Sequence, residues 1–170
     1  MIHDRRYAVA FWSLLLFGSL DVYSKDPDLP KLGSRAPRAA QETGKLIMIH
    51  PADLAREFRL SLQGREFFLG VNSKLRVSHI EVRDPQFVTP EGVRVGDPVQ
   101  KTLNLAGASF QALPGCFAYV LLPSGWAAGF WPLSLDTSKQ GAYSAPRNAE
   151  DVPNSAVVSF IFRSIYLPRR

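Results

Sequence analysis

The residues with the most reactive side chains in this 170-residue chain are Cys116, His50 and His79. A thiol beside an imidazole is the nucleophile and base of cysteine hydrolases, provided that a third group orients the ring. None of the local signatures of such enzymes surrounds Cys116, and its neighbours in 114–119 are apolar on one side, which favours a buried thiol. We therefore expect no enzymatic activity, with a cell-envelope hydrolase that uses Cys116 as the alternative.

Metal, cofactor and paired-carboxylate chemistry find little support in the residue spacing. The two histidines of the folded part are far apart, and neither H-x-x-H nor C-x-x-C occurs, so we predict no metal and no cofactor. Asp84, Glu91 and Asp97 are the carboxylates that could serve glycosidic chemistry. Asp84 and Asp97, however, fit a turn and a helix cap, and we assign them those structural roles.

A binding role remains, and the segment 123–131 carries it. Ser124 and Gly125 form a tight turn with a tryptophan, Trp126, directly after it and a second one, Trp131, on the same predicted strand. Aromatic side chains at hairpin tips are frequent interface hot spots, so Ser124, Gly125, Trp126 and Trp131 are the predicted binding residues. The alternative is that both tryptophans fill the core.

The first 24 residues determine where the protein works. Arg5 and Arg6 precede an apolar stretch over 7–20, and the small-residue site at 22–24 follows it. These are the three parts of a secretory signal peptide, and the apolar stretch is shorter than the ~20 residues of a membrane-spanning helix. We predict a periplasmic or secreted protein, in contact with the membrane only if the signal stays uncleaved. The net charge is +5, but the sequence contains no nucleic-acid-binding motif, so no nucleic-acid partner is expected.

The rest of the chain predicts one β-rich domain. Residues 25–44 are rich in Pro, Lys, Arg, Ser and Gly and predict a flexible lead, and the domain then spans 45–170. The fold class is mainly β: an antiparallel sheet of hairpins with one short helix packed on it. With one cysteine, the domain has no internal disulfide and depends on its apolar core.

The predicted elements follow from alternating apolar residues and turn signals. Strands are expected at 45–49, 58–62, 66–71, 75–82, 117–122, 126–131 and 156–167, with hairpins at Gln63-Gly64 and 123–125 and a helix at 98–106. In 75–82 the apolar phase changes side, which predicts either a bulge near His79 or a strand covered on both faces. The long polar segment 134–154 predicts a functional or disordered loop.

The middle region resembles a pattern of small exported bacterial envelope proteins. There a strand leads into T-x-x-G-h-x-V-G-D/S, where h is apolar, and a helix follows beneath the sheet; here Thr89–Asp97 carries it. Periplasmic inhibitors, immunity proteins against cell-wall-degrading toxins and envelope-assembly factors share this pattern. The resemblance implies an immunity or inhibitor protein that occludes a partner enzyme, possible partners including a cell-wall-degrading enzyme. An envelope structural or assembly factor is the other non-enzymatic alternative.

Overall fold

The protein is a mainly β structure built on one antiparallel sheet. The computed structural model describes residues 28–50, 53–113, 117–131 and 146–168. Eight strands of these residues form a sheet with the order β1-β2-β3-β4-β8-β7-β6-β5. The strands are β1 (Gln41–His50), β2 (Asp53–Leu62), β3 (Arg65–Val71), β4 (Val77–Val82), β5 (Ser109–Ala112), β6 (Ala118–Leu121), β7 (Ala127–Phe130) and β8 (Phe160–Ser164). The predicted fold class is confirmed.

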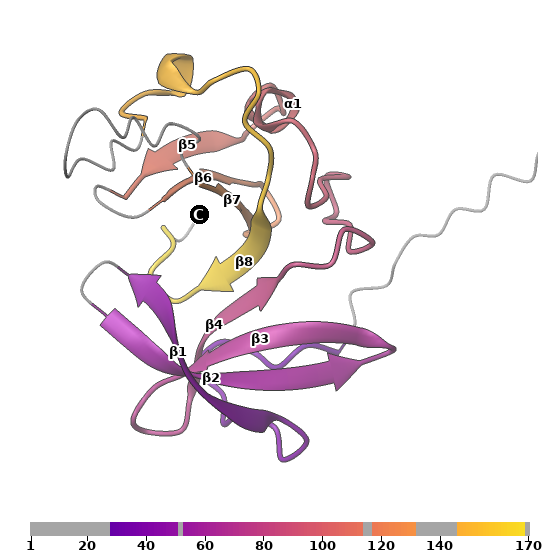
Figure 1. Cartoon of the computed structure of the whole chain (residues 1–170), viewed down its shortest axis with the longest axis vertical. Helices are drawn as coiled ribbons and strands as arrows, with labels where there is room; N and C mark the ends of the chain where they lie inside the picture. The colour runs from indigo at the N-terminus through magenta and orange to yellow at the C-terminus, as the bar shows by residue number, and fades with distance from the viewer. Residues whose placement is uncertain (1–27, 51–52, 114–116, 132–145, 169–170) are drawn as a thin grey trace, which may run out of the picture.

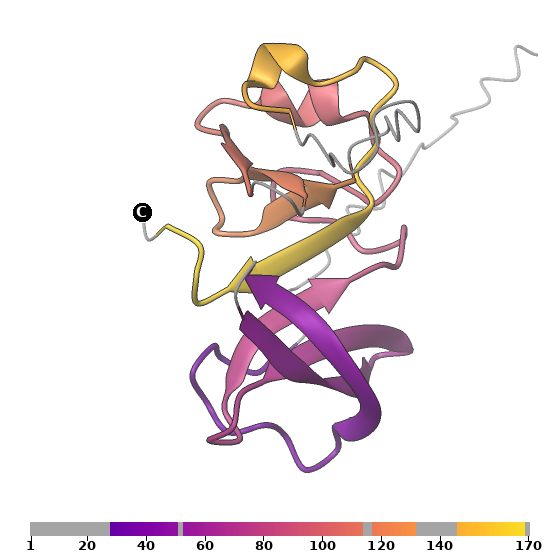
Figure 2. The ribbon, with the colours of Figure 1, turned by 60° about the vertical axis from the view of Figure 1, so that its left-hand side comes forward.

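The sheet is strongly curved, so its two ends form two halves of the molecule. Figure 1 shows β1, β2 and β3 in the lower half and β5, β6 and β7 in the upper half, with β4 and β8 side by side between them. The same division is visible from the second direction (Figure 2). The strand nearest the C-terminus, β8, is therefore central: it joins β4 to β7 through antiparallel pairs on both sides.

Both predicted hairpins are present. The β2–β3 hairpin turns at Gln63 and Gly64, which have φ angles of 51° and 76°, and two successive positive φ angles belong to the type I′ turns that suit hairpins. The β6–β7 hairpin turns at 122–126, where the backbone N–H of Leu122 donates to the carbonyl of Trp126 at 2.8 Å. In each case the local turn chemistry specifies the pairing.

The strand β4 has both features that its sequence left as alternatives. Gly70 pairs with His79 but Val71 pairs with Val77, so Ser78 is the extra residue of a bulge. All six residues of β4 are buried. Because of the bulge, Val77 and Ile80 both contribute to the main core although they are an odd number of positions apart.

The helix is shorter than predicted and its cap differs. The helix α1 spans Val99–Leu103 and buries Val99 and Thr102. Asp97 does not cap it: the Asp97 carboxylate accepts from the backbone N–H of Arg94 at 3.0 Å and from the ammonium group of Lys101 at 3.3 Å. A second helical element is the 3-10 turn η1 (Ala149–Asp151), in the described part of the segment predicted as a long loop.

The segment before β1 packs on the domain, whereas residues 25–44 predict a flexible lead. Leu29, Leu32, Ala36 and Ala40 contact the main core. The backbone N–H of Gly33 donates to the carbonyl of Val77 at 2.7 Å, and Val77 donates in turn to Ser34 at 2.9 Å. The strand β1 begins at Gln41, within the predicted lead. The apolar residues of this segment are too widely spaced to show a strand or helix period. Their contribution to the core is therefore visible only in the folded structure.

Candidate binding groove

The predicted binding hairpin is held against the domain rather than offered to solvent. The side chain of Trp126 is fully buried in the main core, where its ring lies 5.0 Å from that of Phe87. The carboxylate of Glu91 accepts from the backbone N–H of Ser124 at 2.6 Å and from its hydroxyl at 2.9 Å. The guanidinium of Arg163 lies over the Trp126 ring at 4.3 Å. These contacts give Trp126 the core role that was the alternative to binding. The backbone N–H and the hydroxyl of Ser124 are both already bonded to Glu91, so Ser124 is poorly suited to bind a partner.

Trp131 lies in a different environment, so the structure separates the predicted residues. Its side chain is 55% exposed. Its ring lies 5.9 Å from that of Phe117 and 5.5 Å from that of Phe160, both of which belong to a second apolar cluster and not to the core of Trp126. An odd offset along a strand places side chains on opposite faces of the sheet, which is why Trp126 and Trp131 contact different apolar clusters.

Trp131 stands at the edge of a cavity of about 430 Å³, which we call the groove. One wall is Leu46, Ile47 and Met48 of β1, and the opposite wall is Phe117, Trp131 and Phe160. The remaining lining residues are polar: Glu57, Glu81, Arg83 and Ser159. The groove therefore combines two apolar walls with a few convergent charged groups, the usual composition of a ligand site.

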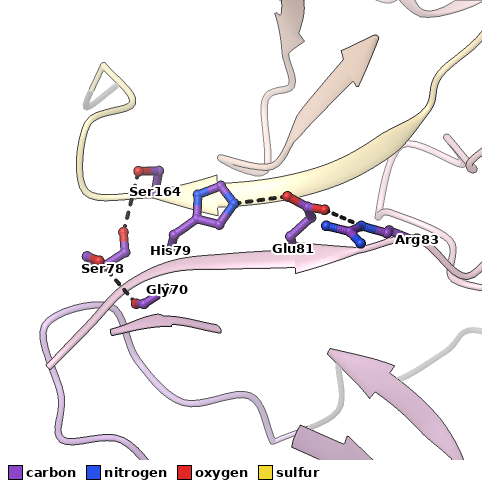
Figure 3. Close-up of polar contacts among 6 residues, drawn as sticks. All are labelled: Gly70, Ser78, His79, Glu81, Arg83 and Ser164. Carbon is purple, nitrogen blue, oxygen red and sulfur yellow. Dashed lines mark hydrogen bonds and ion pairs between the residues drawn. The ribbon is translucent and has the colours of Figure 1, made fainter. Parts of the chain in front are cut away.

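A polar cluster on β4 supplies part of the groove lining (Figure 3). Nε2 of His79 lies 3.4 Å from one carboxylate oxygen of Glu81, and Nε of Arg83 donates to the other at 2.5 Å. The guanidinium of Arg83 also lies over the ring of Phe68 at 4.5 Å. His79 stacks on Phe162 with ring centroids 5.3 Å apart. Each of the three side chains of the cluster is thus held by at least one hydrogen bond or ion pair.

The charge state of Glu81 follows from these contacts. Burial raises the pKa of the Glu81 carboxyl, but the hydrogen bond from His79 and the positive charge of Arg83 lower it more, and the net pKa lies below its usual range. Since an ionised carboxylate only accepts, Nε2 of His79 carries the proton in this hydrogen bond. Nδ1 of His79 has no partner among the described residues. Glu81 is therefore a carboxylate with both oxygens in use, which suits a structural role better than proton transfer.

Glu57 of β2 is the other carboxylate of the groove, and it is held far more loosely. Its residue is 6% exposed. One carboxylate oxygen accepts from the hydroxyl of Thr43 at 2.8 Å, and no ion pair of Glu57 exists within the described part of the chain. Residue spacing did not single out Glu57, Glu81 or Arg83. The available signal was the phase change in 75–82, which puts two ionisable residues in a buried strand.

The other sequence candidates have ordinary roles where the structure describes them. Asp84 accepts from the backbone N–H of Gln86 at 2.8 Å within a turn, and His50 lies 5.3 Å from the Tyr166 ring, centroid to centroid. Cys116 lies outside the described residues. No group of three or more His, Cys, Asp or Glu side chains that could hold a metal ion occurs in the ranges described. Likewise, no helix of these ranges is long and apolar enough to cross a bilayer.

Comparison with known proteins adds no function to this fold. No family model matches the chain, and no curated protein matches it. A solved structure described as the uncharacterized protein yfeY from Escherichia coli is similar, with a TM-score of 0.47 and 14% sequence identity. The match covers 78% of this chain and 95% of that one.

Proposed function

We propose that the protein is an exported, non-enzymatic binding protein of the inhibitor or immunity kind, which holds a segment of a partner protein in its groove. The observation that carries the proposal is the groove itself, with an exposed apolar rim. Leu46 is 63% exposed, Met48 43% and Trp131 55%, and all three line the same cavity. Exposed apolar side chains gathered around a concave site are typical of interaction surfaces.

A protein partner fits this rim better than a small molecule does. The three rim residues line the cavity and are also 43–63% exposed, so they present apolar area to a surface larger than the cavity itself. Tryptophan is enriched among interface hot spots because it buries a large area with few rotatable bonds. If the bound segment belongs to an enzyme's active-site loop, holding it would block that enzyme, which is how an immunity protein would act.

The test is a pull-down from periplasmic extract with three baits. These are the full chain, a Trp131→Ala variant of the groove rim, and a Val157→Ala variant as the control. Val157 is 44% exposed but is absent from the groove lining, so Val157→Ala removes exposed apolar area outside the groove, although less of it than Trp131→Ala does. We expect a protein retained by the full chain and by Val157→Ala, but lost with Trp131→Ala, and inhibited by the full chain when it is assayed as an enzyme. An identical set of proteins on all three baits would refute the proposal.

A further inference from the structure

The two carboxylates of the groove differ in how well they are satisfied. Both oxygens of Glu81 are bonded, one to His79 and one to Arg83. Glu57 has one hydrogen bond through its carboxylate, from a neutral hydroxyl, although an ionised carboxylate offers about four acceptor positions. Glu57 is therefore the carboxylate of this groove with acceptor capacity to spare.

A buried carboxylate without a cation is costly, and none of the ion pairs between described residues involves Glu57. Removing a charge from water is compensated in proteins by ion pairing or by several hydrogen bonds. Among the described residues, the groove lining contains two carboxylates, Glu57 and Glu81, and one guanidinium, Arg83, an excess of one negative charge. Because Arg83 is already bound to Glu81, that excess resides at Glu57.

The walls beside Glu57 are apolar, so a cation that binds Glu57 should carry an apolar part that contacts these walls. Ile47 of β1 faces the same side of the sheet as Glu57 and provides an aliphatic wall, and the half-exposed ring of Trp131 provides a flat one. A lysine or arginine side chain has a matching structure, since a hydrocarbon stem of three or four carbons precedes its charge. An aromatic face near a cation adds a further attraction.

We infer that the groove binds a lysine or arginine side chain of the partner protein, with the charged head on the Glu57 carboxylate and the stem between the β1 wall and Trp131. This inference rests on the proposed function, because it names the group that the partner inserts. It assigns Glu57 as the residue that selects the charge of the partner segment, and Trp131 as the residue that contacts its stem.

The experiment selects peptides from a random heptapeptide display library on the immobilised full chain, with Trp131→Ala as the counter-selection. Enriched peptides are synthesised and their affinities measured by fluorescence anisotropy on the full chain, on Glu57→Gln and on Glu66→Gln. Glu66 is the control because its side chain is exposed and pairs with Arg59 at the surface. Each peptide is also made with norleucine in place of its basic residue, which keeps the stem and removes the charge.

We expect enriched peptides to share a Lys or Arg next to an apolar residue. Glu57→Gln and the norleucine peptide should each weaken binding roughly ten- to hundredfold, the loss typical of a buried charge-assisted hydrogen bond, while Glu66→Gln leaves it within about twofold because exposed ion pairs contribute little. Should Glu57→Gln not fold, the norleucine comparison on the unaltered chain decides the matter.

Three results would count against the inference, and they are distinguishable. Peptides that depend on Trp131 but carry no basic residue, or that bind equally as norleucine versions, overturn the role of Glu57 and leave the proposed function standing. Acidic peptides that lose binding with Arg83→Gln would show that the groove selects anions instead. If no peptide depends on Trp131, both the inference and the proposed function fail.

Discussion

The substitution Gly129→Ala tests the packing that shapes the groove wall. Gly129 of β7 pairs with Phe160 of β8, and the Phe160 ring lies directly on the glycine. A Cβ at position 129 would lie 2.9 Å from Cδ2 of this ring and closer still to Cε2 and Cζ. Carbon atoms pack at about 3.5–4.0 Å, so the ring must move away by about an ångström.

The magnitude depends on whether the ring has room to move. Phe160 is 5% exposed, and its ring is enclosed by those of Phe117, Phe162 and Trp131 at 5.2, 5.6 and 5.5 Å between centroids. Overpacking of an enclosed core site costs about 1–3 kcal/mol. Gly→Ala also restricts the unfolded chain, which offsets about 0.4–1 kcal/mol of that. We therefore expect a net loss of about 1–2 kcal/mol, or a fall in Tm of roughly 3–8 °C for a domain of this size.

The assay is urea unfolding followed by tryptophan fluorescence, with a double-mutant cycle as the control. Gly129→Ala is compared with the parent chain and, separately, on the background of Phe160→Leu, where the ring that causes the clash is gone. Substitutions in direct contact do not add, so alanine at 129 should cost less than about 0.5 kcal/mol on the leucine background. Equal costs on the two backgrounds, or an unchanged free energy of unfolding in Gly129→Ala alone, would refute the reasoning.

Three further outcomes follow from the structure and two from the sequence. Trp126→Ala is expected to lower the free energy of unfolding by about 3–5 kcal/mol because it empties a fully buried site. Trp131 is half-exposed, so Trp131→Ala should lower it by about 1 kcal/mol or less and weaken binding instead. Urea titrations of both variants measure the two losses. Burial raises the pKa of Glu81 but its two partners lower it more, so its contribution to stability is present above about pH 4.5 and is lost as the pH falls through its folded-state pKa; unfolding titrations between about pH 6 and pH 3 should show a shallower acid dependence in Glu81→Gln. Cys116→Ala is expected to leave partner binding unchanged, and a loss of peptidoglycan-degrading activity in a lysate would favour the hydrolase instead. Mass spectrometry of the exported protein should find its first residue at Lys25, and a full-length mass would argue for an uncleaved anchor.

The hairpins were predictable because the information for them is local. Gln63-Gly64 supplies the positive φ angles that its turn requires, and apolar residues alternate on either side of it. The start of β1 was not predictable in this way. Its first four residues, 41–44, lack apolar side chains, and the first two of them pair with Arg59 and Phe58 on the following strand. These residues are part of a strand because they lie along β2, not because of their own sequence pattern. Such a strand has no apolar period from which it could be predicted.

The groove could not be predicted from spacing, since its lining comes from an edge strand, β1, and from strands in the middle and the other half of the sheet. Met48 and Phe160 line the same cavity although more than a hundred positions separate them. They meet because β8 inserts between β4 and β7, and a sequence pattern does not fix strand order. The sequence predicted Trp131 as a binding residue because of its place in the hairpin 123–131. In the structure Trp131 instead lines the cavity, and Trp126 of the same hairpin belongs to the core.

The bulge at Ser78 lets one strand serve both the main core and the groove. With an unbroken period of two, Val77 and His79 would share one face and Ile80 would lie on the other. The extra residue lets Val77, Ile80 and Val82 all face the main core, and it leaves His79 and Glu81 together on the opposite face. That face is the one from which Glu81 lines the groove. Without the bulge, Val77 would share the face of His79 and Glu81, so the same local irregularity lets β4 complete the core with Val77 while Glu81 stays on the groove face.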